Sequence, residues 1–289
     1  MQGEPYTRRQ LLAATGALGA AALGGPLMLG AAAVSDYPKV VLAKKPVAYW
    51  RLGEKQGPTA QDSTGHGHKG TYRGTPTFRE PGAIRGDTNG AIKLDGKHSY
   101  VEVANHADLS QPTSGQGLTV EVWVRPDVLD FTGETKDGYI YWLGKGQAKQ
   151  LEWALRFYSR KAKGRPNRIS AYIFNREGGL GAGAYFQDKL KAGEWIHVVA
   201  CYEPGDAATK GRRGVHIYKN GEHRLGPPSP GTLYKNPKWR IKPTRGAAPL
   251  RLGTHDLKGF LVGGLDEVAI YPRVLTPKEV LENYHAAKG

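Results

Sequence analysis

From residue 46 onward, hydrophobic and polar residues alternate with a period of two. In residues 118–125, four aliphatic side chains face one way and Thr119, Glu121, Trp123 and Arg125 face the other, which is the pattern of a strand. Runs of the same kind, separated by turn signals, lie at 46–52, 91–95, 100–103, 139–143, 151–158, 169–174, 195–202, 215–218, 250–252 and 265–271. Ten or more short strands with no helical pattern between them predict an all-β sandwich or jelly roll.

Two local signals refine this prediction. Gly96-Lys97-His98-Ser99 contains a glycine turn signal and predicts a hairpin that joins 91–95 to 100–103. Thr276, Pro277 and Glu279 fit an N-cap, a first-turn proline and a capping-box glutamate, so they predict a short helix that ends near residue 287. Its apolar stripe, expected to pack on the sandwich, is Val280, Leu281 and Tyr284.

Residues 1–33 differ from the rest of the chain. Arg8 and Arg9 precede an apolar run without a charge before Asp36, and Ala31 and Ala33 form an A-x-A cleavage pattern. This segment predicts an export signal, and its paired arginines resemble the bacterial twin-arginine signal. The alternative is an uncleaved N-terminal membrane helix. We therefore expect a signal at 1–33, a lead-in at 34–45 and one domain at 46–289.

Composition supports an exported β-protein. The 289 residues include 41 Lys and Arg against 26 Asp and Glu, a net charge of +15, and removing residues 1–33 leaves +14. Cys201 is the single cysteine, which excludes a disulfide framework and any cysteine-based zinc or iron–sulfur site. Hydrophobic residues make up 39% of the chain, too many for a disordered protein and too few for a multi-spanning membrane protein.

Several segments occur in an order typical of one family. They are 47–52 (VAYWRL), 62–70 (DSTGHGHKG), 92–96 (IKLDG), 118–124 (LTVEVWV), 193–199 (GEWIHVV), 215–221 (VHIYKNG) and 264–271 (GLDEVAIY). Over residues 46–288 the chain resembles the laminin-G-like, concanavalin A-like jelly-roll superfamily, in the form common in secreted bacterial proteins. The resemblance implies two stacked antiparallel sheets with a concave face. It leaves the activity open, because this superfamily contains binding modules, glycoside hydrolases and polysaccharide lyases.

A structural calcium ion is the first candidate ligand. Asp62 opens a loop rich in hydroxyls and glycines, which can direct oxygen atoms at a hard cation. The resemblance implies that Asp266 completes such a site, although Thr64 and His66 depart from the usual Asp-x-Ser-Gly-Asn form. The alternative is an Asx turn beside a solvated carboxylate. His66 and His68 raise the question of zinc, but with no cysteine and no second histidine pair a solvated loop is favoured.

Catalytic patterns are weak. Glycosidase relatives carry a Glu-x-Asp-x-x-Glu strand, which this sequence lacks, and Glu121 and Glu152 are the acidic residues expected in mid-strand opposite the apolar stripe. Lyase chemistry would draw on Tyr158, Tyr172, His197 and Arg156. The sequence has no serine-hydrolase elbow and no nucleotide-binding fingerprint. We therefore predict no catalytic residues, with a hydrolase or lyase as the alternative.

Aromatic and basic residues point to carbohydrate. Trp123, Tyr158 and Tyr172 alternate away from the apolar stripes, so we expect them on the concave face, where flat rings stack on sugars. The predicted ligand-binding residues are Glu121, Trp123, Arg125, Arg156, Tyr158 and Tyr172.

Three clusters of basic residues favour an anionic ligand. Seven basic residues and no acid lie between residues 156 and 176, and the other clusters are Lys210, Arg212 and Arg213, and Lys235, Lys238, Arg240, Lys242 and Arg245. Such charge concentrates polyanions, including acidic polysaccharides, although it can also serve solubility alone. Nucleic acid is a poor partner for an exported chain without a binding motif. The sequence thus predicts a secreted, non-catalytic carbohydrate-binding domain, with a protein-interaction module as a further alternative.

Overall fold

A computed structural model describes residues 35–110, 117–175, 181–203, 214–224 and 243–289. The chain divides into residues 1–33 and a compact unit, Val34–Gly289, and all described residues belong to the second. The predicted export signal therefore lies outside the described residues. In the described part, no helix is long and apolar enough to cross a membrane.

The compact unit is built mainly from strands, as the alternation predicts. In chain order its elements are α1 (Tyr37–Ala43), β1 (Ala48–Trp50), β2 (Thr59–Ala60), β3 (Gly70–Arg73), β4 (Thr77–Glu80), β5 (Ala91–Asp95), β6 (Tyr100–Val103), the 3-10 turn η1 (Ala107–Leu109), β7 (Leu118–Pro126), β8 (Tyr139–Gln147), β9 (Gln150–Tyr158), β10 (Arg168–Phe174), β11 (Gly181–Gln187), β12 (Ile196–Glu203), β13 (Gly214–Lys219), β14 (Glu222–His223), β15 (Leu250–Leu252), β16 (Val262–Tyr271) and α2 (Pro277–Lys288).

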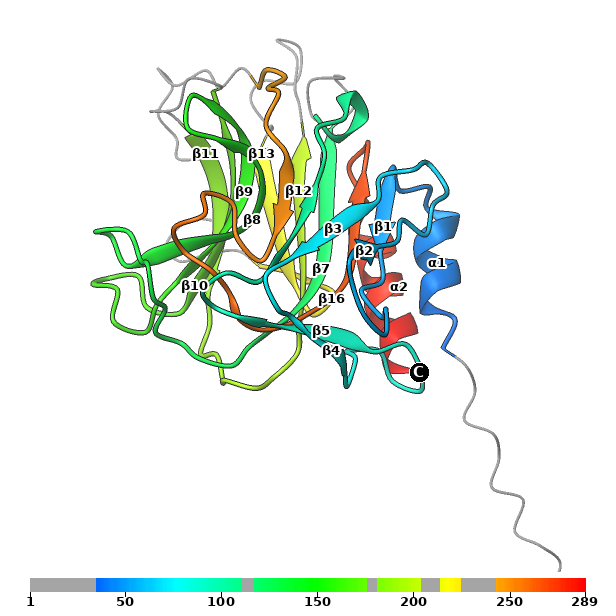
Figure 1. The fold of residues 1–289 in the computed structure, drawn as a ribbon. Coiled ribbons are helices and arrows are strands. Elements are labelled where there is room, and N and C mark those ends of the chain that lie inside the picture. The colour runs from blue at the N-terminus through cyan, green and yellow to red at the C-terminus, as the bar shows by residue number, and fades with distance from the viewer. Residues whose placement is uncertain (1–34, 111–116, 176–180, 204–213, 225–242) are drawn as a thin grey trace, which may run out of the picture. The chain divides into compact units, whose positions relative to one another are not determined.

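The strands form two antiparallel sheets (Figure 1). Sheet A has the order β14-β13-β12-β7-β16-β5-β4, and β1 pairs with the far end of β16. Sheet B has the order β11-β10-β9-β8-β15-β6-β3-β2. The main core fills the space between the sheets, with Val120 and Val122 from sheet A and Leu155 and Phe157 from sheet B among its members. This confirms the predicted concanavalin A-like β-sandwich.

A second apolar cluster covers the outer face of sheet A. Helices α1 and α2 lie side by side there (Figure 1) and bury Tyr37, Val41, Val280 and Ala287 against the sheet. The capping box predicted for α2 is present: the Thr276 side chain accepts the Glu279 N–H, and the Glu279 carboxylate accepts the Thr276 N–H. The sequence predicted α2 but not α1, which lies in the expected lead-in.

The hairpin predicted between residues 91–95 and 100–103 is wrong. β5 pairs with β16 and β4 in sheet A, whereas β6 pairs with β15 and β3 in sheet B, so the turn crosses from one sheet to the other. Asp95 makes this crossing possible, because its Oδ1 accepts the backbone N–H groups of Lys97, His98 and Ser99 at 2.9–3.0 Å. These donors need no strand partner.

Candidate functional site

The six predicted ligand-binding residues do not share one surface. Glu121, Trp123 and Arg125 lie on β7 of sheet A, while Arg156 and its neighbours on β9 and β10 belong to sheet B. In both strands these residues point away from the main core, so the core of the sandwich separates the two sets. The alternation identified the outward-facing positions correctly, but it could not assign them to a sheet.

The sheet A residues are sealed beneath the two helices. Glu121 has no exposed surface, and its carboxylate accepts hydrogen bonds from His197 Nε2 at 2.8 Å, Tyr271 Oη at 2.7 Å, Tyr37 Oη at 3.0 Å and Asn283 Nδ2 at 2.8 Å. Burial alone would raise the pKa of Glu121, but the bonds from His197, Tyr271 and Asn283 outweigh it and leave the pKa below its usual value. Glu121 therefore acts as a buried anion that ties α1 and α2 to the sheet.

The side chains of Trp123 and Arg125 also bind other side chains of the protein. Trp123 is fully buried, donates its indole N–H to Tyr37 Oη at 3.2 Å and stacks on His197 with ring centroids 4.9 Å apart. Arg125, at the edge of this face, pairs with Glu80 at 3.2 Å and Asp127 at 3.1 Å. These contacts make the sheet A face a second core layer.

The sheet B residues form a cluster on the outer face of that sheet. The strand register sets Arg156 opposite Tyr141 on β8 and opposite Ser170 on β10, and Tyr158 opposite Tyr139. Side chains two residues apart on one strand share a face, which adds Tyr172 to the same surface. We call Arg156, Tyr139, Tyr141, Tyr158 and Tyr172 the Arg156 cluster.

The guanidinium of Arg156 sits among four tyrosine rings. Its Cζ lies 3.3 Å from the ring centroid of Tyr172, 4.6 Å from Tyr139, 5.6 Å from Tyr158 and 5.8 Å from Tyr141. Arg156 is 7% exposed, and its Nη2 has no hydrogen-bond partner among the described residues. Cation–π contacts of this kind contribute about 1–2 kcal/mol each when desolvated. The rings offset part of the cost of burying the charge, and both N–H bonds of Nη2 lack an acceptor among the described residues.

The same face continues onto β11. Arg168 on β10 lies with its Cζ 3.8 Å from the ring centroid of Tyr185 and 5.5 Å from that of Tyr158. It is 8% exposed, donates to Gln187 Oε1 at 3.2 Å and has an Nε without a partner in the described part of the chain. Two buried cations thus lie on this face with donor groups not used by the described residues.

An open cavity of about 540 Å³ lies beside the Arg156 cluster. Two loops line it, at residues 134–138 before β8 and 161–165 after β9, and the first leads directly into Tyr139. Arg165 connects the two regions, because its Cζ lies 5.9 Å from the ring centroid of Tyr158. The basic residues in the lining are Lys136, Lys161, Lys163 and Arg165, against Glu134 and Asp137. The volume suits a short stretch of an oligosaccharide chain, and the net charge of the lining is positive.

A histidine that the sequence did not single out borders this face. The ring of His255 lies 5.4 Å from that of Tyr141, and its backbone N–H donates to Tyr141 O at 3.1 Å. Burial lowers the pKa of His255 to about 4, so its imidazole is neutral at pH 7. Neither ring nitrogen makes a hydrogen bond of normal geometry to a described residue.

The predicted catalytic sets do not assemble. Glu121 lies on β7 of sheet A beneath the helices, whereas Glu152 lies at a bulge in β9 of sheet B, where it is buried and pairs with Lys145 at 2.6 Å. The two carboxylates therefore cannot flank one sugar ring. His197 also lies beneath the helices, apart from Tyr158, Tyr172 and Arg156. The lyase set expected from the sequence is therefore incomplete on either face.

The predicted calcium ligands have other partners. Asp62 Oδ1 accepts the Tyr49 N–H and the N–H and hydroxyl of Thr64, and Oδ2 accepts the His68 N–H, all at 2.7–3.1 Å. Asp266 is buried and accepts the Ala83 N–H at 2.8 Å. Asp62 would have to release donors to take an ion, so in this conformation the residues do not fit the predicted site. Calcium binding stays a prediction.

Asp266 and Glu267 lie at a β-bulge in β16, next to each other and both buried. Burial raises the pKa of Asp266, and the charge of Glu267 raises it further. Burial also raises the pKa of Glu267, to about 7, although Arg51 lies 3.0 Å from its carboxylate and opposes the shift. The bulge thus buries two acids where the solvent cannot stabilise both charges.

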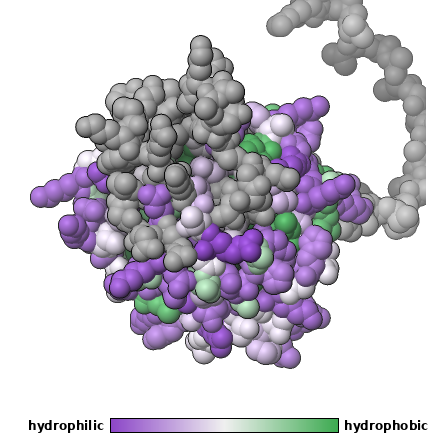
Figure 2. Space-filling model, turned by 90° about the horizontal axis from the view of Figure 1, so that it is seen from above, coloured by the Kyte–Doolittle hydropathy of each residue, from purple (hydrophilic) through white to green (hydrophobic). Residues whose placement is uncertain are grey.

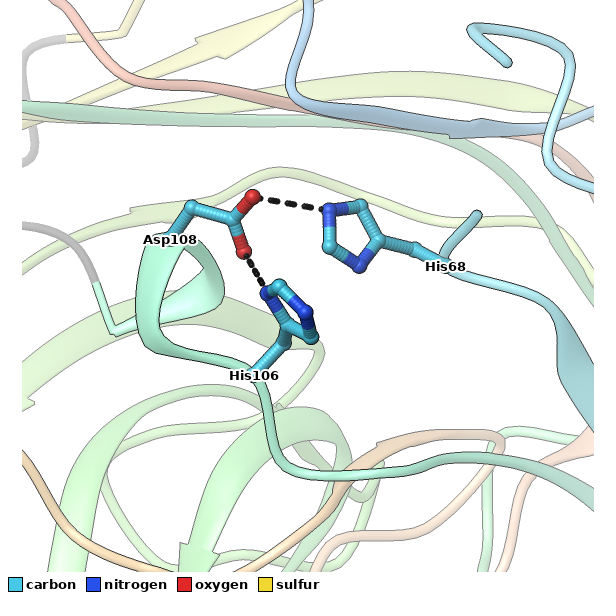
Figure 3. Close-up of side chains that lie close together, drawn as sticks. All are labelled: His68, His106 and Asp108. Atoms are coloured by element: carbon cyan, nitrogen blue, oxygen red, sulfur yellow. Dashed lines mark hydrogen bonds and ion pairs between the residues drawn. The ribbon is translucent and has the colours of Figure 1, made fainter. Parts of the chain in front are cut away.

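A histidine–aspartate group was also missed. His68, His106 and Asp108 come together at one end of sheet B, although some forty residues separate the first from the other two (Figure 3). From the sequence, His68 was weighed as a metal ligand only together with His66, and no local pattern points to His106.

Of the basic clusters, Arg176 and the residues of 204–213 and 225–242 lie outside the described residues.

Comparison with known proteins supports the fold. Residues 95–281 match the model of the concanavalin A-like lectin/glucanases superfamily. Domain 4 of AbnA, an extracellular arabinanase from Geobacillus stearothermophilus solved in complex with arabinotriose, superposes with a TM-score of 0.56 at 21% identity, over 83% of this chain and 98% of that domain. The receptor binding domain of the botulinum neurotoxin C/D mosaic serotype gives 0.56 at 12% identity, over 83% of this chain and 51% of that one. No curated protein matches the sequence.

Proposed function

We propose that this chain, which belongs to the concanavalin A-like lectin/glucanase superfamily, binds carbohydrate on the outer face of sheet B. The proposed site consists of the Arg156 cluster and the cavity beside it. The observation that carries the proposal is the set of four tyrosine rings around one arginine, next to a basic cavity of about 540 Å³.

Tyr139 and Tyr141 supply the stacking surface, because Tyr158 and Tyr172 are buried. Tyr139 and Tyr141 are partly exposed and pack edge to face, with centroids 5.3 Å apart. The apolar face of a sugar ring packs well on such rings, while its hydroxyls remain free to hydrogen-bond. Arg156, buried among the rings, holds them in place, so little side-chain entropy is lost when a sugar binds.

The cavity supplies charge. Lys136 and Lys163 are exposed in its lining, and no ion pair of either is found among the described residues. A carboxylate or sulfate group on the glycan would pair with them at little cost, because neither lysine has an ion-pair partner to leave in the part of the chain that the structure describes. We therefore propose an acidic polysaccharide as the ligand class, bound outside the cell after export by the 1–33 segment.

The described surface fits a polar ligand better than an apolar protein partner. The large hydrophobic residues exposed in the described part are Leu42, Leu257 and Leu281. Seen from above, the surface formed by described residues is mostly hydrophilic (Figure 2). Large contiguous apolar patches mark many protein interaction sites, and single exposed leucines do not form one.

Calorimetric titration with matched oligosaccharides tests the proposal. We expect a uronate-containing oligomer to bind more tightly than a neutral oligomer of the same length and to lose affinity as salt is raised. Lys136→Ala/Lys163→Ala should weaken binding by about tenfold or more. Lys39→Ala/Lys278→Ala removes the same charge from α1 and α2 and should bind like the parent. Equal losses in the two variants, or no glycan binding at all, would reject the site.

A second candidate function is polysaccharide lyase activity, which the neutral imidazole of His255 favours. A lyase needs a base to remove the proton next to a uronate carboxylate, an acid for the leaving oxygen and a cation for the carboxylate. His255, Tyr141 and Arg156 supply these types, with ring and guanidinium centres 5.4–5.8 Å from Tyr141. His255 is 1% exposed, which is why binding is the first proposal. Ultraviolet absorbance of unsaturated uronate, lost in His255→Asn and Tyr141→Phe, would establish the lyase.

A further inference from the structure

His68, His106 and Asp108 are each held by the backbone around them. His68 follows the Asp62 loop, where its N–H donates to Asp62 and its carbonyl accepts the Trp50 indole N–H at 2.7 Å. His106 directly precedes the turn η1 and Asp108 lies in it, and Leu109 anchors this turn in the main core with no exposed surface. The loop that holds His68 precedes β3, and η1 follows β6. Because β3 and β6 are paired, the three side chains converge on a fixed place.

The side chains converge through their polar atoms (Figure 3). His68 Nε2 lies 2.9 Å from Asp108 Oδ2, and His106 Nδ1 lies 2.7 Å from Asp108 Oδ1. The imidazole rings meet edge to face, with centroids 4.6 Å apart. One ligand atom from each residue lies within 4.8 Å of the other two. A tetrahedral zinc ion with bonds of about 2.0–2.1 Å needs its ligand atoms about 3.3 Å apart, so small side-chain rotations suffice.

The donor set selects among metals. Two imidazole nitrogens and one carboxylate oxygen suit zinc and the later first-row divalent ions, whereas calcium and magnesium prefer oxygen alone. The exposure of the residues is graded: the His68 side chain is 2% exposed, Asp108 41% and His106 60%. One buried ligand fixes the ion, and the open side leaves a coordination position for water or an external ligand.

We propose that His68, His106 and Asp108 form a binding site for a zinc-type divalent cation. The ion would join the loop before β3 to the turn after β6. This site uses other side chains than the predicted calcium site, although the His68 N–H donates to Asp62. It shares no residue with the Arg156 cluster, so the proposal is independent of the proposed carbohydrate function.

Metal titration of the untagged full chain, freed of metal with a chelator, tests this proposal. We expect one zinc ion per chain with a dissociation constant of about 1 μM or lower. Cobalt chloride should give the visible absorption of tetrahedral cobalt, which hydrogen bonds among the three residues cannot produce. His106→Ala should weaken zinc binding at least about tenfold and abolish the cobalt spectrum.

His98 offers a matched control. It is an exposed histidine 3.2 Å from the Asp95 carboxylate, and no third ligand group accompanies this pair in the described part of the chain. His98→Ala should bind zinc like the parent. Asp108→Asn provides a second variant that keeps the size of the side chain and should also weaken binding. Absence of zinc binding, or equal weakening by His98→Ala and His106→Ala, would overturn the proposal.

Discussion

Glu121 on β7 and His197 on β12 are joined by a 2.8 Å hydrogen bond, and neither side chain has any exposed surface. The pair lies under two helices that are far apart in the sequence. Tyr37 of α1 and Asn283 of α2 both donate to the same carboxylate. Glu121, expected from the sequence to face a ligand, is thus the polar centre that fixes the helices to sheet A.

The first prediction concerns the stability contributed by this centre. Glu121→Gln should lower the free energy of unfolding by about 3 kcal/mol, because it replaces a buried carboxylate that accepts four hydrogen bonds with an amide that has only one acceptor oxygen. Urea denaturation followed by circular dichroism measures the change. Glu282→Gln on the exposed side of α2 should cost less than about 1 kcal/mol. Equal stability of Glu121→Gln and the parent would contradict the assigned role.

The second prediction concerns pH. Burial raises the folded-state pKa of Glu267 from 4.5 to about 7, so folding favours the protonated carboxyl. The contribution of Glu267 is most favourable below pH 4.5 and is lost as the pH rises to 7, by on the order of 2–3 kcal/mol. Glu267→Gln should flatten the stability profile in this range, measured in EDTA. A variant with an unchanged slope would show that Glu267 does not titrate in this range.

The third prediction concerns the crossing between the sheets. Asp95→Ala should destabilise the fold by about 2 kcal/mol, because three backbone N–H groups lose their acceptor. Asp95→Asn should cost less, since an amide oxygen can still accept. Lys97→Ala, in the same turn, serves as the control, because only its backbone N–H takes part. Equal losses in the free energy of unfolding for the three variants would contradict this prediction.

The fourth prediction addresses calcium. Asp62→Ala should lower the melting temperature by the same amount in EDTA and in calcium chloride, because the four donors on this carboxylate belong to the chain itself. A loss of stability that appears only with calcium would establish the ion expected from the sequence. Differential scanning calorimetry of parent and variant in both buffers gives the comparison.

Much of the fold could be predicted because its signals are local. The alternation in 118–125 and the capping box at Thr276 depend on residues within one turn or one strand, and both are present in the structure. The sheet to which each strand belongs is not a local property. β5 and β6 both send aliphatic side chains into one core, which gives a hairpin and a crossing turn the same sequence pattern.

The site was harder to predict for the same reason. On β7 both faces are buried, one by sheet B and one by the helices, so polar positions such as Glu121 look like an exposed face. For Arg156 and Tyr158 the alternation correctly predicted side chains that point away from the main core, but not the sheet to which they belong. His255 and His106 were missed because their importance depends on neighbours far away in sequence.

Hydrogen–deuterium exchange with and without a bound uronate oligosaccharide tests the proposed site most directly. We expect slower exchange in 134–141 and 156–165, which contain the cavity lining and Tyr139, Tyr141 and Tyr158. Exchange in α1 and α2 on the opposite face should stay unchanged. Protection confined to the helices, or an oligosaccharide that binds without slowing exchange in the two loops, would contradict a carbohydrate site on sheet B.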